Sequence, residues 1–194
     1  VAVGTPILFT AIGEIIAEKS GVQNLGLEGM MYMGAITAFL SGLALTSSGL
    51  PTTAALIIVI ILSAIVVALV ASILAFLFLS LRANQIVSGL ALSILGTGLS
   101  YYIGKVFISD PTAIIKTRLT QFTFADAVQI PVVGEILRIF LNQDILVYLA
   151  YIMVILVWFY MYKTQKGLDL RAIGENPGAA DAVEVNVKLS RYIY

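Results

Sequence analysis

The chain contains 194 residues, of which 60% are hydrophobic and 11% are charged, and its formal net charge is zero. Soluble domains carry roughly 25% charged residues, so this composition indicates an integral membrane protein. Cysteine and histidine are both absent, which excludes disulfide bonds, thiolate chemistry and Cys-ligated zinc, and removes the commonest general base and metal ligand. We expect no metal and no cofactor. The zero net charge by itself says nothing about nucleic acid, and we expect no nucleic-acid partner.

The apolar segments are continuous rather than alternating, which favours spanning helices over a β-barrel. A span needs about 20 apolar residues. We predict an all-α, polytopic transmembrane bundle that forms one domain over residues 1–194. Five spans are expected, at residues 3–17, 24–45, 52–81, 85–104 and 145–162. Whether the fourth segment crosses the whole membrane is left open. The final residues SRYIY resemble the first turn of another span, so we expect a chain truncated at its C-terminus.

The loops between these spans differ in length and charge. Short turns are expected at 18–21 and 46–51, whereas residues 105–144 form a long mixed region with two prolines. Within that region, residues 132–141 are expected to form a short amphipathic helix on the membrane surface. Lys and Arg are enriched in cytoplasmic loops. Placing Lys163 inside puts region 105–144 outside and most basic residues inside, namely Lys19, Arg82, Lys163, Lys166, Arg171, Lys188 and Arg191. The loop at 163–188 is therefore predicted to be cytoplasmic.

This cytoplasmic loop contains a polar segment, residues 167–187, directly after an uncharged apolar span. Asn176 is a favourable N-cap residue and Pro177 suits the first helical position, so a short helix is expected to begin there. Both signs of charge are present, which fits docking to a protein better than to a lipid surface. The alternative is an ordinary solvated loop.

Polar residues also stand where the second and fourth spans begin. Asn24 and Glu28 are four apart, which would place them on one helix face. Asn84, Gln85 and Ser88 supply amide and hydroxyl groups that can bind sugar hydroxyls without fixing a charge. These five residues are candidates for a transport pathway, because polar, glycine-interrupted segments line transport sites. The alternatives are interfacial placement of Glu28 and close helix packing by small residues, which is also the interpretation of the Gly/Ser run at 88–100.

Three stretches carry a family resemblance: EKSGVQNLGLEGMMYMGA (18–35), LRANQIVSGLALSILGTGLS (81–100) and GLDLRAIGENPGAADAVEVNV (167–187). In this order they resemble permease subunits of bacterial ABC importers, within the branched-chain amino acid/ribose superfamily and nearest to nucleoside and simple-sugar permeases. The resemblance implies a type II-like permease fold and a location in the bacterial inner membrane. It also implies a coupling helix that seats on a separate ATPase. The residues that match the coupling loop are Arg171, Glu175, Asn176, Pro177, Ala179 and Ala180, whereas Glu184 stands where the family usually has glycine.

The same resemblance implies three partners besides the bilayer. These are a cytoplasmic ATP-binding cassette ATPase, a second permease chain that is identical or homologous, and an extracytoplasmic substrate-binding protein. The chain itself would then not be an enzyme, since no nucleotide-binding glycine loop occurs in it. The competing hypothesis is a secondary carrier or channel that is driven by a gradient through Glu28 and Glu14.

Overall fold

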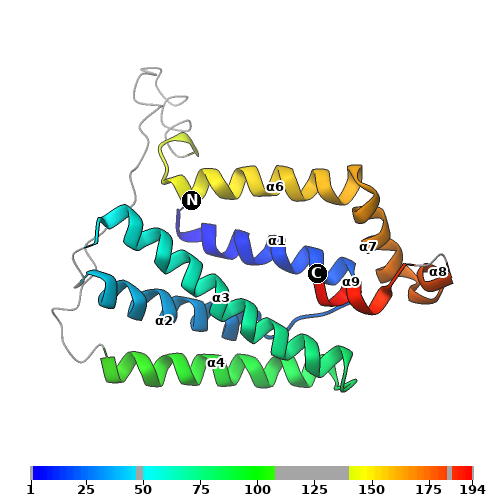
Figure 1. Ribbon diagram of the computed structural model, residues 1–194, viewed down its shortest axis with the longest axis horizontal. Helices are drawn as coiled ribbons and strands as arrows, with labels where there is room; N and C mark the ends of the chain where they lie inside the picture. Colours follow the sequence, from blue (N-terminus) through cyan, green and yellow to red (C-terminus); the bar gives the residue numbers. More distant parts are fainter. Residues whose placement is uncertain (1, 47–49, 108–139, 183–184, 194) are drawn as a thin grey trace. The chain divides into compact units, whose positions relative to one another are not determined.

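The computed structural model describes the chain except for residues 1, 47–49, 108–139, 183–184 and 194. Every regular element assigned in the described part is a helix (Figure 1). A short 3-10 helix, η1 (Ala2–Gly4), precedes the α-helices. These are α1 (Thr5–Lys19), α2 (Leu27–Thr46), α3 (Thr52–Leu79), α4 (Gln85–Phe107), α6 (Ile145–Lys163), α7 (Gln165–Glu175), α8 (Pro177–Ala182) and α9 (Val187–Ile193). The predicted all-α class is confirmed. Most of region 105–144, including nearly all of the amphipathic helix expected at 132–141, lies outside the described residues.

Four of the described helices are long and apolar enough to cross a membrane: α2, α3, α4 and α6. The fourth expected span is one continuous helix of 23 residues. The first expected span differs, because α1 contains only 15 residues. At 1.5 Å per residue a helix of that length extends roughly 22 Å, less than the hydrocarbon core of about 30 Å. The expectation of five spans therefore becomes four candidate spans in a multi-pass membrane protein.

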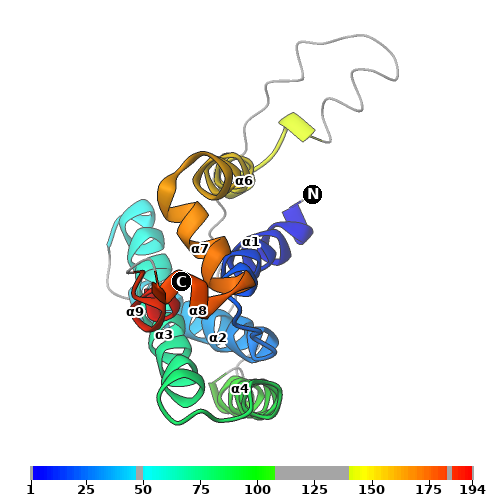
Figure 2. The same cartoon turned by 90° about the vertical axis from the view of Figure 1, so that its right-hand side faces the viewer.

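The described helices belong to two units, which we describe separately. One unit covers residues 22–117 and 188–194 and contains α2, α3 and α4. Its central helix is α2, which packs against both α3 and α4 (Figures 1 and 2). Met30 from α2 and Leu74 and Phe78 from α3 form its buried cluster. These side chains come from the ends of the helices that lie near the loop before α2.

Glycine residues bring the backbones of α2 and α4 into direct contact. A Cβ atom built on Gly96 would lie 2.6 Å from the carbonyl oxygen of Gly29, and one built on Gly29 would lie 2.5 Å from that of Leu92. Gly89 is less tightly placed, because a Cβ atom there would lie 3.0 Å from the backbone nitrogen of Leu25. Small residues allow membrane helices to approach this closely. The packing interpretation of the Gly/Ser run at 88–100 is therefore confirmed for Gly89 and Gly96, whereas a Cβ atom at Gly98 would meet nothing within 4 Å.

The other unit covers residues 1–21 and 118–187 and contains α1, α6, α7 and α8. α1 packs on α6, and the two helices run in the same direction (Figure 1). The α6 side chains Val147, Ala150 and Met161 are buried, with at most 2% of their surface exposed. α7 then leaves the end of α6 and contacts both α6 and α1. The end of α1 and the polar segment thus lie at the same end of this unit, as the distribution of Lys and Arg predicted.

Candidate functional site

The polar segment after α6 folds into two helices rather than one. α7 was not predicted, and the sequence contains two signals for it. The Thr164 side chain caps this helix by accepting a hydrogen bond from the Gly167 backbone N–H at 3.1 Å. Leu170 and Ile173, three residues apart, are completely buried. Two glycines in an eleven-residue helix lower its intrinsic propensity, so these tertiary contacts stabilise it.

The short helix α8 begins where the sequence predicted. The Asn176 side chain accepts a hydrogen bond from the Ala179 backbone N–H at 3.1 Å, and Pro177 is the first residue of the helix. The backbone N–H of Asn176 donates to the Ala172 carbonyl at 2.9 Å, so this residue also ends α7. One asparagine therefore fixes the corner between the two helices.

The residues expected to dock a partner fall into two groups. Glu175, Asn176, Pro177 and Ala179 are exposed and form a contiguous surface at this corner, which we call the α8 surface. Ala180 is 2% exposed and packs inside the unit, so its side chain does not reach a partner. The Arg171 guanidinium lies over the Tyr162 ring, with 5.0 Å from its central carbon to the ring centroid. The structure thus assigns Arg171 and Ala180 to the attachment of this segment.

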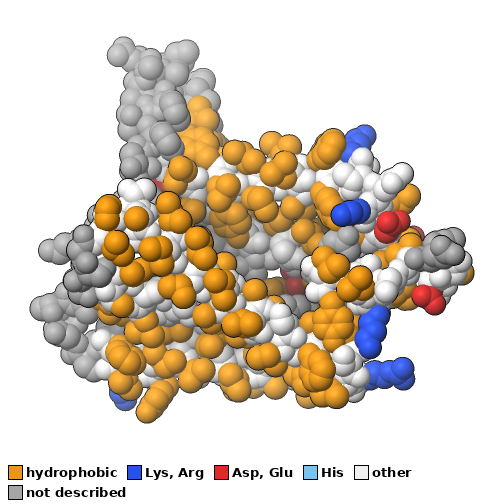
Figure 3. All heavy atoms as spheres, viewed as in Figure 1, with side chains coloured by type: hydrophobic (Ala, Val, Ile, Leu, Met, Phe, Trp, Pro, Cys, Tyr) orange, Lys and Arg blue, Asp and Glu red, His pale blue; other side chains and the backbone are white. Residues whose placement is uncertain are grey.

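Hydrophobic side chains cover the visible face of α6 in Figure 3, whereas charged side chains gather at its end and over α7 and α8. Lys163 closes α6, with its amino group 5.8 Å from the centroid of the Trp158 ring. Tyr162 is also exposed in this last turn. Aromatic rings and a basic residue at the end of an apolar helix are typical of a membrane interface. We therefore expect the α8 surface to lie on the aqueous side of that boundary.

The candidate pathway residues before α2 occupy a turn rather than a helix face. α2 begins at Leu27, so Asn24 precedes it, and the expected helical pairing of Asn24 with Glu28 is wrong. The Asn24 side chain instead accepts a hydrogen bond from the Gly26 backbone N–H at 2.9 Å. Its amide nitrogen lies 3.7 Å from the Met30 sulfur. Glu28 is exposed in the first turn of α2, where the helix dipole favours a carboxylate.

Of the candidate residues at the start of α4, Asn84 caps the helix and Gln85 holds the loop before α2. Asn84 accepts hydrogen bonds from the backbone N–H groups of Ile86 at 3.0 Å and Val87 at 3.2 Å. The Gln85 side-chain oxygen accepts from the Gln23 backbone N–H at 3.0 Å. Ser93, which the sequence analysis assigned only to close packing within the Gly/Ser run, donates its hydroxyl to the Leu25 carbonyl at 2.9 Å. Asn84 and Gln85 are thus brought together with the loop that contains Asn24.

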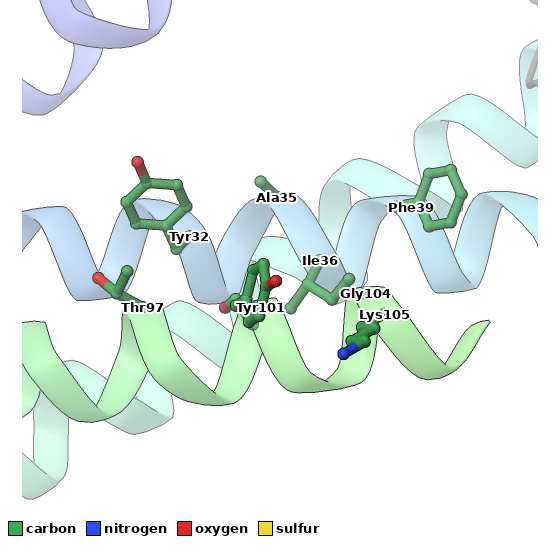
Figure 4. Close-up of a pocket in the computed structure, with 9 residues that line it drawn as sticks. Tyr32, Ala35, Ile36, Phe39, Thr97, Tyr101, Gly104 and Lys105 are labelled. Atoms are coloured by element: carbon green, nitrogen blue, oxygen red, sulfur yellow. The ribbon is translucent and has the colours of Figure 1, made fainter. Parts of the chain in front are cut away.

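Two cavities adjoin these helices in the same unit. Ser88 lines a cavity of about 370 Å³ whose other walls are aliphatic side chains of α3 and α4. A larger cavity of about 860 Å³ lies between α2 and α4 (Figure 4). Its polar lining consists of Tyr32, Thr97, Ser100, Tyr101 and Lys105. The sequence analysis missed this second cavity, because its residues come from two spans and have no recognisable spacing.

Comparison with known proteins identifies relatives of this arrangement. The family model described as branched-chain amino acid transport system / permease component matches residues 1–193. The nucleoside ABC transporter permease protein NupC of Lactococcus lactis is 34% identical over 97% of this chain and 58% of its own length. The guanosine ABC transporter permease protein NupQ of Bacillus subtilis is 35% identical over 97% of this chain and 58% of its length.

The putative glucose ABC transporter permease protein TsgC13 of Haloferax volcanii is 34% identical over all of this chain and 55% of its own length. The chain thus spans a little more than half the length of these relatives. No solved structure matches the chain significantly. The family match covers nearly every residue, including all three stretches on which the resemblance was based. The chain belongs to the branched-chain amino acid transport system / permease component family.

Proposed function

We propose that this chain belongs to a membrane-spanning permease subunit of an ABC importer that moves a nucleoside or a simple sugar. The observation that carries the proposal is the α8 surface, an exposed and capped corner beyond the apolar end of α6. The names of the relatives support both the transporter class and the class of substrate. They favour this reading over a gradient-driven carrier that uses Glu28 and Glu14.

The partners follow from this assignment. A cytoplasmic ATP-binding cassette ATPase would dock on the α8 surface and supply the ATP hydrolysis, so this subunit would transport without being an enzyme. A second permease chain, identical or homologous, would complete the passage, and an extracytoplasmic binding protein would deliver the substrate. The complex would reside in the inner membrane of a bacterium.

The pathway would follow α2 and α4. Glu28 would present its exposed carboxylate at the start of α2, and Ser88 would contribute a hydroxyl at the start of α4. Asn24, Asn84 and Gln85 would shape the same region through their hydrogen bonds to backbone groups. The cavity with Tyr32 and Tyr101 lies further along the same two helices. Its rings and hydroxyl groups suit a ligand with an aromatic base or a sugar face.

The Ala179→Asp substitution tests the docking assignment in the intact transporter. Ala179 is exposed, so a carboxylate there places an unpaired charge in the proposed interface without disturbing the interior of α8. We expect loss of ATPase co-purification from membranes and loss of ATP-dependent uptake. The control is Gln165→Asp, which removes an exposed amide at the start of α7 and adds the same charge there.

Normal co-purification and uptake with Ala179→Asp would contradict the docking assignment. Uptake that continues without the ATPase and collapses on addition of an uncoupler would support the carrier instead. In that case Glu28→Gln should abolish the pH dependence of transport, whereas in a permease it should alter substrate affinity or have little effect.

A further inference from the structure

α7 is joined to the ends of two other helices through backbone contacts. Gly167, near its start, lies against the carbonyl oxygens of Tyr160 and Met161 at the end of α6. Gly174, near its end, lies against the carbonyl group of Lys19, the last residue of α1. A Cβ atom at either glycine would clash with these backbone atoms. Both helix ends can therefore approach α7 only because these two positions lack a side chain.

Side chains strengthen the same attachment. Leu170 and Ile173 of α7 are completely buried, and so is Ser20 in the turn after α1. The Ser20 hydroxyl donates to the Ala17 carbonyl at 2.6 Å, which fixes that turn. Arg171 lies over the Tyr162 ring of α6. Close-packed interiors transmit strain, so a displacement of α7 would be passed to the ends of α1 and α6 that pack against it.

The segment that follows α8 is attached differently. α9 contacts α3 through a hydrogen bond between the Tyr192 and Ser80 hydroxyls, 2.6 Å apart and exposed. None of the described residues of α9 is buried. Surface side chains change rotamer easily, whereas buried backbone contacts do not. The contact with α7 and the burial of Ala180 are therefore what hold α8 in its own unit.

We propose that Gly174 is a positioning residue for energy coupling, through which a displacement of the α8 surface reaches the turn after α1. The proposal rests on the function proposed above, in which an ATPase docks on the α8 surface. Gly174 itself need not touch the ATPase, because its contacts within the described chain are with Lys19 and Gly21. Its role would be to hold α7 close enough to α1 for both to move as one body.

The test is Gly174→Ala in the purified transporter, assembled with its ATPase and reconstituted with its binding protein. A Cβ atom would clash with the Lys19 carbonyl, so the contact between α7 and the end of α1 must open, while every side chain of the α8 surface is retained. We expect normal ATPase co-purification and retained ATP hydrolysis, with a fall of about tenfold in substrate moved per ATP, within the range of measured coupling between sites. The matched control is Gly13→Ala in α1, where a Cβ atom would meet nothing within 4 Å.

Unchanged transport per ATP in an assembled Gly174→Ala transporter would overturn the proposal, as would an equal loss in Gly13→Ala. If Gly174→Ala fails to assemble, Ser20→Ala decides, because it removes only the hydroxyl that fixes the same turn. That variant should also lower transport per ATP while ATP hydrolysis persists, and normal coupling would count against the proposal. Failure of the docking assignment is distinguishable, since Ala179→Asp would then leave ATPase binding intact.

Discussion

The α2–α4 pair and the α7 attachment both depend on glycine, but the two regions use it differently. Along α2 and α4, glycines on both helices face each other within the membrane-spanning segments, as Gly29 and Gly96 do. In α7, Gly167 and Gly174 each meet backbone carbonyl groups at the end of another helix. The first arrangement joins two helices side by side, whereas the second joins the start and end of one short helix to two neighbours. Glycine therefore serves packing in one unit and attachment of the polar segment in the other.

The largest expected effect comes from breaking the α2–α4 contact with Gly96→Leu. The added side chain would collide with the Gly29 backbone, which cannot move aside as a flexible side chain does. Overpacking a closely packed contact costs about 1–3 kcal/mol or more, so we expect little folded protein in membranes. Size-exclusion chromatography after detergent extraction measures the yield.

Gly98→Leu is the matched control for this prediction, because it makes the same substitution two residues further along α4. A Cβ atom at Gly98 would meet nothing within 4 Å, so this variant should be recovered at normal yield. Equal loss in both variants would show that α4 tolerates no large residue, and the Gly29–Gly96 contact would not be the cause.

A smaller effect is expected from Tyr101→Leu. This substitution tests whether the α2–α4 pair also contacts the substrate. Tyr101 lines the larger cavity (Figure 4). Losing an aromatic contact of about 0.5–1.5 kcal/mol would weaken apparent substrate affinity roughly two- to twelvefold. Uptake of radiolabelled nucleoside over a concentration series gives KM and the maximal rate separately, and KM should rise while the maximal rate changes less.

Tyr102→Leu provides the comparison for Tyr101→Leu. Tyr102 is the next residue and is 67% exposed, but it is not among the residues that line the cavity. Its KM should stay near that of the unmodified transporter. If the two variants behave alike, the cavity has no special role in substrate affinity, and α2 and α4 serve packing alone.

Much of the membrane-spanning part could be predicted from the sequence, because long uncharged segments permit few other structures. The α8 start was also predictable, since the Asn176 cap and Pro177 act locally. α7 was not, because Gly167 and Gly174 argue against a helix until their close backbone contacts are known. A glycine that lowers helix propensity and a glycine that permits tertiary contact look the same in one sequence.

The sequence was sufficient to select the candidate site residues, but it did not predict what their side chains do. Asn24 and Asn84 were chosen for chemistry toward a substrate, yet their side chains bond to backbone N–H groups. Asparagine before an apolar helix has both uses, and local capping competes with ligand binding. Ala180 was expected at the docking surface, but the turn of α8 places it inside. In a six-residue helix a one-position difference separates an exposed face from a buried one.

The smallest effects are expected from removing the two asparagine caps, one in each unit. Replacing an N-cap asparagine by alanine costs about 1 kcal/mol. Asn84→Ala should therefore lower the thermal stability of the extracted protein by a few degrees, and Asn84→Asp should retain it because a carboxylate also accepts the Ile86 and Val87 N–H bonds.

Asn176→Ala removes the same kind of cap from α8, which lies outside the apolar spans. We expect little change in thermal stability, because α8 has only six residues and Ala180 is its one buried residue. Without the hydrogen bond from the Ala179 N–H, the orientation of α8 relative to α7 would no longer be fixed. We therefore expect ATPase co-purification to fall instead. A stability loss in Asn176→Ala equal to that in Asn84→Ala, with ATPase binding unchanged, would mean that both caps serve the fold alike. In that case Asn176, like Asn84, would stabilise the fold and would have no separate role in docking the ATPase.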